Sequence, residues 1–170
     1  MDEKDQPPRI DVQHGDSIKR QLANDTVIQK PLVIDLKLEN SYRKRLYEAS
    51  LDVRQSVFVT ISGLAPGPDK NVSIRCFLNL PSANVKTQAD DPHYAGSFSF
   101  FIDVSEKNRE FSQRIELDQV ILKLSERGLW NGTNSFKLTL LAAPLNEQNI
   151  NIDARIPITA ISLEIAESSK

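Results

Sequence analysis

Few residues in this sequence are of types that carry out chemistry. It contains two histidines, His14 and His93, and a single cysteine, Cys76. A site for a first-row metal needs several His, Cys or carboxylate ligands at workable spacings. His93 follows closely on Asp90 and Asp91, but three polar residues just before a strand are more typical of a turn. The sequence therefore predicts no metal site and no cofactor site.

Covalent catalysis is not predicted either. A serine or cysteine nucleophile needs a base and an orienting group beside it. Cys76 alternates with apolar residues, which predicts a buried and unreactive thiol. Gly63 and Gly67 lie in a proline-rich turn that does not open a helix, unlike a phosphate-binding loop. We therefore expect no catalytic residues and no enzymatic activity in this chain.

The charge balance limits the classes of partner. The 170 residues include 21 basic and 23 acidic side chains, for a net charge of -2. A phosphate-binding surface needs a concentrated positive field, so nucleic acid is not an expected partner. The basic cluster Arg43–Arg45 is typical of a solvated face. No apolar run approaches the roughly 18 to 20 residues of a membrane span. The first residues are polar and unlike a signal peptide. We expect a soluble protein that does not enter membranes, with its compartment left open.

The chain length fits one domain. Residues 1–30 are polar and have little apolar periodicity, which predicts an extended arm or linker before a domain at residues 31–170. Such an arm either packs along the domain or is ordered by a neighbour. With one cysteine, the domain has no internal disulfide.

Alternating apolar residues predict the strands. The central pair is 71–80 and 94–104, where Phe98 and Phe100 are expected to dominate the core. Gly96 replaces a side chain on that face, which predicts a bulge or a close backbone approach. Further strands are predicted at 32–39, 55–64, 112–117, 135–141 and 154–166, the last interrupted by Pro157.

Helix signals are sparse. Asp118 is a suitable N-cap and Gly128 a suitable terminator for a short helix over 118–128. Residues 41–49 fit either a short helix capped by Ser41 or an irregular connection. The pattern as a whole predicts an all-β protein, an antiparallel β-sandwich of about seven strands with one short helix.

The central pair also carries a family resemblance. The runs Arg-Cys-Phe-Leu-Asn-Leu-Pro (75–81) and Asp-Pro-His-Tyr-Ala-Gly-Ser-Phe-Ser-Phe-Phe (91–101) resemble the carboxy-terminal β-sandwich of tyrosinases and polyphenol oxidases. That sandwich follows the catalytic domain and is related to the one in molluscan haemocyanins. The helix ending near Gly128, the run Lys-Leu-Thr-Leu-Leu-Ala-Ala-Pro (137–144) and the Ile-rich strand 156–165 occur in the same order as in the family.

The resemblance implies an accessory role. In the family, histidines of a separate helical bundle hold two copper ions, and two histidines cannot supply that site. We therefore expect a non-catalytic sandwich that shields, stabilises or docks onto a tyrosinase-like catalytic domain, as the family's sandwich covers the entrance to the copper site. His93 and Tyr94, at the end of loop 82–93, and Trp130 are the candidates for facing that partner. The alternative is a stand-alone assembly protein that self-associates through the arm 1–30 by strand addition.

Overall fold

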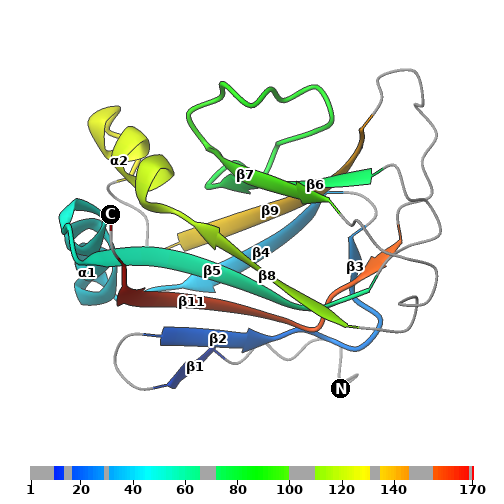
Figure 1. Ribbon diagram of the computed structural model, residues 1–170, viewed down its shortest axis with the longest axis horizontal. Helices are drawn as coiled ribbons and strands as arrows, with labels where there is room; N and C mark the ends of the chain where they lie inside the picture. The colour runs from blue at the N-terminus through cyan, green and yellow to red at the C-terminus, as the bar shows by residue number, and fades with distance from the viewer. Residues whose placement is uncertain are drawn as a thin grey trace.

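The computed structural model describes residues 10–13, 17–28, 31–65, 72–99, 110–130, 135–145, 155–168 and 170. Two antiparallel sheets pack face to face around one core (Figure 1). One sheet has the spatial order β1 (Ile10–Gln13), β2 (Ser17–Gln21), β11 (Ala160–Glu167), β5 (Gln55–Leu64) and β8 (Phe111–Glu116). The other has the order β4 (Leu32–Lys37), β9 (Ser135–Pro144), β6 (Val72–Leu78) and β7 (Tyr94–Ser99). The predicted all-β, antiparallel sandwich is confirmed.

The described part of the chain holds more elements than the sequence predicted. A small two-stranded sheet joins β3 (Val27–Ile28) to β10 (Ile156–Pro157). The described residues form eleven strands, whereas the sequence predicted about seven. Pro157 lies in the short strand β10, which is separate from β11. The predicted interruption of the last strand at Pro157 is therefore confirmed. No helix in the described ranges is long and apolar enough to cross a membrane.

The core follows the alternation of the strands. Strand β5 has the predicted bounds, and Val57, Val59 and Ile61 on one of its faces are fully buried. Strand β4 likewise buries Ile34 and Leu36. Side chains from both sheets therefore meet in one apolar layer, as in other sandwiches.

The central pair contains a bulge. Cys76 pairs with Gly96, but Phe77 pairs with Tyr94, so β7 gains one residue relative to β6. The bulge predicted at Gly96 is confirmed. The predicted role of Phe98 is wrong in degree, since this ring is only partly buried against the core. The large fully buried aromatic side chains are those of Phe77 and Phe136. Phe100 lies outside the described residues.

Two helices lie together at one end of the sandwich (Figure 1). Residues 41–49, which fitted two interpretations, are part of helix α1 (Asn40–Leu51), whose N-cap is Glu39 rather than Ser41. The Tyr42 hydroxyl reaches the Leu163 carbonyl oxygen at 3.4 Å, which ties α1 to β11. Burial, with Glu164 nearby, raises the pKa of Tyr42 to about 12.

Helix α2 (Asp118–Glu126) is the helix predicted from residues 118–128. Its N-cap is Leu117, so the predicted capping role of Asp118 is wrong. Gly128 ends the helix as predicted, with φ of +69°. The Gly128 N–H donates to the Ser125 carbonyl, and the Leu129 N–H donates to the Leu124 carbonyl. These two bonds form a Schellman motif, which favours glycine in the left-handed position.

Residues 17–28, which belong to the predicted arm 1–30, contact the sandwich. Strand β2 pairs with β11 along five residues, and Ile18 and Ile28 are buried in the core. The Arg20 guanidinium donates to the Asp35 carbonyl oxygen at 2.6 Å, which links the two sheets. The described part of the predicted arm therefore packs along the domain, one of the two alternatives left open by the sequence.

Candidate docking site

The connection between β6 and β7, residues 79–93, forms an ordered loop above the four-stranded sheet (Figure 1). Hydrogen bonds close its base. The Leu78 N–H donates to the His93 carbonyl at 2.8 Å, and the Asn79 N–H donates to the Lys137 carbonyl at 2.7 Å. The Asn79 side-chain oxygen accepts from the Lys137 N–H at 2.9 Å. Connections of this length without regular structure are uncommon unless they serve a function.

A second, smaller apolar cluster fills the space under the loop, and we call it the outer cluster. It consists of buried Phe77, Ala83 and Leu141, with Leu80 and Tyr94 packed against them. The bulge in β7 directs Tyr94 into this cluster, where its ring meets that of Phe77 edge-on at a centroid distance of 5.6 Å. The chain's own loop thus covers the part of the outer face of the four-stranded sheet that carries Phe77 and Leu141.

Polar contacts fix the outer part of the loop. The Arg75 guanidinium reaches up from β6 to the carbonyl oxygens of Val85 and Thr87, at 3.3 and 3.4 Å. The Asn84 side chain accepts from the Lys86 N–H, and the Thr87 hydroxyl accepts from the Asn84 N–H. The Val85 side chain stays 55% exposed. The loop therefore exposes the apolar side chain of Val85, while hydrogen bonds fix the main chain that carries it.

The loop borders an open hollow of about 420 Å³. All six of its lining residues are polar and come from this loop: Asn84, Lys86, Thr87, Gln88, Asp90 and Asp91. Their side chains offer amides, a hydroxyl, an ammonium group and two carboxylates, a mixture suited to hydrogen bonding with a protein surface.

His93 and Tyr94, two of the predicted partner-facing residues, lie together at the end of the loop. The Nδ1 atom of His93 lies 2.8 Å from the Leu78 carbonyl oxygen. The main-chain N–H of His93 donates to the Asp91 carboxylate. A carbonyl oxygen only accepts, so Nδ1 is the donor in this contact and Nε2 is the ring nitrogen left for other partners. His93 and Tyr94 are both partly buried, and their role toward a partner stays a prediction.

The structure places Trp130 in the core rather than on a surface. Its side chain is 4% exposed and meets Phe136 edge-on at 6.3 Å. The Arg43 guanidinium lies 5.3 Å from the Trp130 ring centre and donates to the Trp130 carbonyl. Trp130, which the sequence suggested as a residue facing a partner, is therefore buried, because Arg43 of α1 lies over its ring. Arg43 is also buried, unlike the solvated face expected for its basic cluster, and burial lowers its pKa.

Other chemistry-bearing residues do not converge. Cys76 is fully buried, and burial raises the pKa of its thiol to about 12. Within the described ranges, no group of three or more His, Cys, Asp or Glu side chains is placed to hold a metal ion. His14 lies outside the described residues. Sequence reasoning missed that Arg75 and Phe77 anchor the loop 79–93. The available signal was Phe77 itself, an apolar side chain on a face of β6 that otherwise carries polar residues.

Comparisons with known proteins identify the fold. No protein-family model and no curated protein sequence matches this chain. Among solved structures, recombinant latent aurone synthase, a polyphenol oxidase, matches over 88% of this chain with a TM-score of 0.57 and 16% identity. The same enzyme from its natural source matches with a TM-score of 0.57 and 15% identity.

The likeness covers one part of those proteins. This chain spans 27% of the length of each of these two oxidase chains. A third structure, recombinant latent aurone synthase co-crystallised with hexatungstotellurate(VI) and soaked in H2O2, aligns with 96% of this chain and 30% of its own at a TM-score of 0.54. At such low identity the likeness is one of fold. In its fold, this chain resembles a portion of the polyphenol oxidases, as the resemblance in its central strand pair predicted.

Proposed function

We propose that this chain is a non-catalytic accessory sandwich that docks onto a tyrosinase-like copper oxidase domain and shields it. The observation that carries the proposal is the fold likeness to latent polyphenol oxidases. The aligned region covers 88% of this chain but only 27% of each oxidase chain. The remainder of such an oxidase is the natural partner for a domain of this fold.

The composition supports a role without catalysis. Two copper ions held by histidines need more imidazole ligands than the two histidines of this chain provide. The thiol of Cys76, the other soft ligand, is fully buried. The copper chemistry therefore belongs to the partner, and this chain acts on access to it.

Loop 79–93 is the proposed contact surface. Its backbone is held by Arg75 and by the outer cluster, so docking would cost little ordering entropy. Val85 supplies an exposed apolar contact, and the hollow beside it supplies polar groups of both charges. A loop of this kind suits an apolar patch rimmed by polar groups, as expected around the entrance of a phenol-oxidising site.

The test mixes this chain with the catalytic domain of a tyrosinase from the same source and measures monophenol oxidation. We expect a dose-dependent loss of rate. Val85→Asp places a charge at the contact and should raise the half-inhibitory concentration at least about tenfold. Val53→Asp is the matched control, since Val53 is 72% exposed and lies in the connection between α1 and β5, away from loop 79–93.

Two results would contradict the proposal. One is an unchanged oxidation rate together with no complex on a sizing column. The other is an equal effect of both substitutions, which would mean that loop 79–93 is not the contact surface.

A second candidate function is self-association through the amino-terminal hairpin. Strand β1 is the edge of the five-stranded sheet and pairs with β2 alone among the described strands. An open edge can accept a strand from another copy. In this candidate function, the sandwich associates with other copies of the chain and has no oxidase partner.

Light scattering on a sizing column separates the two candidates. The full chain is compared with a chain that begins at Asp16, which lacks β1 but keeps the core residues Ile18 and Ile28. An oligomer that becomes a monomer on truncation supports self-association. An unchanged mass dismisses it.

A further inference from the structure

The ammonium group of Lys170 is held by four oxygen atoms at the helical end of the sandwich. It donates to the carbonyl oxygens of Ala49, Ser50 and Asp52, at 3.2, 3.1 and 2.6 Å. It also forms an ion pair with Oδ2 of Asp118 at 3.2 Å. We call these four oxygens the oxygen cage. In Figure 1 the chain end marked C lies between α1 and α2, the two helices that supply the cage.

The cage has the electrostatics of a cation site. Three of its oxygens belong to the end of α1 or to the residue just beyond it, where the helix carbonyls carry partial negative charge. The last turn of α1 has no basic residue of its own, so the positive charge comes from a residue 118 positions after Asp52. Lys170, far away in the sequence, therefore supplies the positive charge at the carboxyl end of α1 that a basic residue within the last turn often supplies.

The carboxylate of Asp118 adds a full negative charge in a buried place. Its side chain is 2% exposed, and Oδ1 accepts from the Val57 N–H at 2.9 Å. Oδ2 faces the ammonium group of Lys170, and this ion pair compensates its negative charge. A buried carboxylate that loses such a partner is strongly destabilising.

Glu116 of β8 brings a second acid to the same place. Burial raises its pKa, and the charge of Asp118 and a hydrogen bond with it act in the same direction. The charge of Lys170 acts in the opposite direction. A second carboxyl group thus lies near enough to the oxygen cage to be influenced by the charges of Asp118 and Lys170.

We propose that the oxygen cage is a binding site for a primary alkylammonium group, filled within the chain by Lys170. A primary ammonium brings N–H donors to the carbonyls and a charge to Asp118, whereas a quaternary ammonium has no N–H to donate. The same cage therefore accepts a lysine side chain from another protein, or a small alkylammonium ion, when Lys170 is withdrawn. This proposal is independent of the docking role of loop 79–93.

Thermal unfolding of the full chain carrying Lys170→Ala tests the site. We expect the midpoint to fall by about 5 to 10 °C. Ethylammonium chloride should recover at least about 3 °C of this loss in a saturable manner, while tetramethylammonium chloride of equal ionic strength should not. Lys44→Ala is the control, because Lys44 lies in an exposed pair with Glu48 and its loss should shift the midpoint by less than about 1 °C.

The double variant Lys170→Ala, Asp118→Asn should not distinguish the two ammonium salts, since the buried charge is gone. An unchanged midpoint in Lys170→Ala would overturn the proposal. So would equal effects of ethylammonium and tetramethylammonium, which would indicate a general salt effect.

Amine labelling of the unaltered chain covers the case in which Lys170→Ala does not fold. We expect acetic anhydride to modify Lys170 at least about fivefold more slowly than Lys44, and Asp118→Asn to bring the two rates closer together. Equal rates in the unaltered chain would show that the ammonium group is not held, and would overturn the proposal.

Discussion

Replacing Phe77 by alanine tests whether the outer cluster holds loop 79–93. The Phe77 side chain is fully buried, and its ring meets the edge of the Tyr94 ring. Burial of its area contributes about 2 to 3 kcal/mol, and an edge-on aromatic pair adds about 0.5 to 1.5 kcal/mol. Leu80 and Tyr94 are only partly buried and can settle into the cavity. We therefore expect a loss of about 3 kcal/mol in the free energy of unfolding, the lower end for a buried phenylalanine.

Two measurements follow the effect of this change. Equilibrium unfolding in urea gives the loss in free energy, and amide hydrogen exchange shows where the structure opens. Because Ala83 packs on Phe77, its amide, which donates to the Leu80 carbonyl, should exchange faster in the variant. Amides of β5 should be affected only through the lower global stability.

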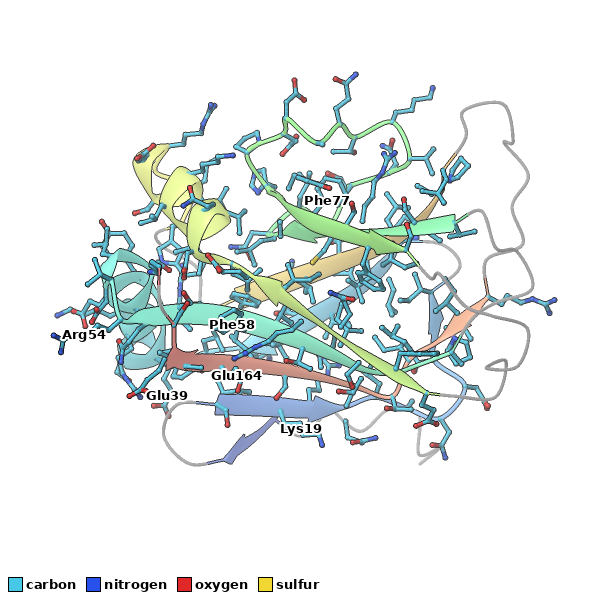
Figure 2. All side chains as sticks on the ribbon, in the orientation of Figure 1. Lys19, Glu39, Arg54, Phe58, Phe77 and Glu164 are labelled. Carbon is cyan, nitrogen blue, oxygen red and sulfur yellow. The ribbon has the colours of Figure 1, made fainter. Side chains whose placement is uncertain are left out.

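Phe58→Ala is the matched control. Figure 2 labels both rings, and that of Phe58 lies on the outer face of the five-stranded sheet, 3.6 Å below the Arg114 guanidinium. Because it is only partly buried, its loss should cost about 1 kcal/mol and leave the loop amides unchanged. A loss below about 1 kcal/mol for Phe77→Ala, or unchanged exchange at Ala83, would refute the role assigned to the outer cluster.

Three further predictions concern stability. Gly63→Ala should cost well over 2 kcal/mol in thermal denaturation, because the new Cβ would lie 2.1 Å from the Thr159 hydroxyl oxygen. Gly128→Ala has nearly the same positive φ but open space around it, so about 1 kcal/mol is expected, and equal losses would contradict the clash. Stability should fall as pH rises from 9 toward 12, because the Cys76 thiol ionises in the unfolded chain near its ordinary pKa of 9.0 but in the folded chain only near a pKa of about 12. Urea unfolding of Cys76→Ala should lack this part of the slope, and an identical slope would count against a buried thiol. The pKa of Glu116 is raised in the folded chain. Stability should therefore fall as the pH rises from the ordinary pKa of a glutamate through the higher pKa of Glu116 in the folded chain. Glu116→Gln should therefore stabilise the protein at pH 7 relative to pH 3, and equal changes at the two pH values would exclude this coupling.

Local alternation was enough to predict most of the sandwich. Strand β5 was predicted from end to end, because successive residues of an antiparallel strand face the core and the outside in turn. The amino-terminal strand β2 was missed because it places only Ile18 in the core among polar neighbours. Its partner is β11, and no feature near residue 18 indicates a strand almost 150 positions away.

The candidate site was predicted in part. Gly96 indicated a bulge, but not that the bulge turns Tyr94 to the face opposite Phe98. Phe77 lies on the face of β6 away from the main core, and its burial depends on a loop that folds back over it. Trp130 could not be placed, because its burial depends on Arg43 of a helix nearly 90 residues earlier in the chain.

The position of β11 has a consequence for protein synthesis. This strand, residues 160–167, lies in the middle of the five-stranded sheet, between β2 and β5. Until it emerges from the ribosome, the sheet exists as two separate pieces with open edges and an incomplete apolar face. Open edges and exposed apolar surface invite aggregation and chaperone binding. We therefore expect a nascent chain that stops before Ala160 to bind chaperones, and the complete sheet to form only after residue 167 has been synthesised.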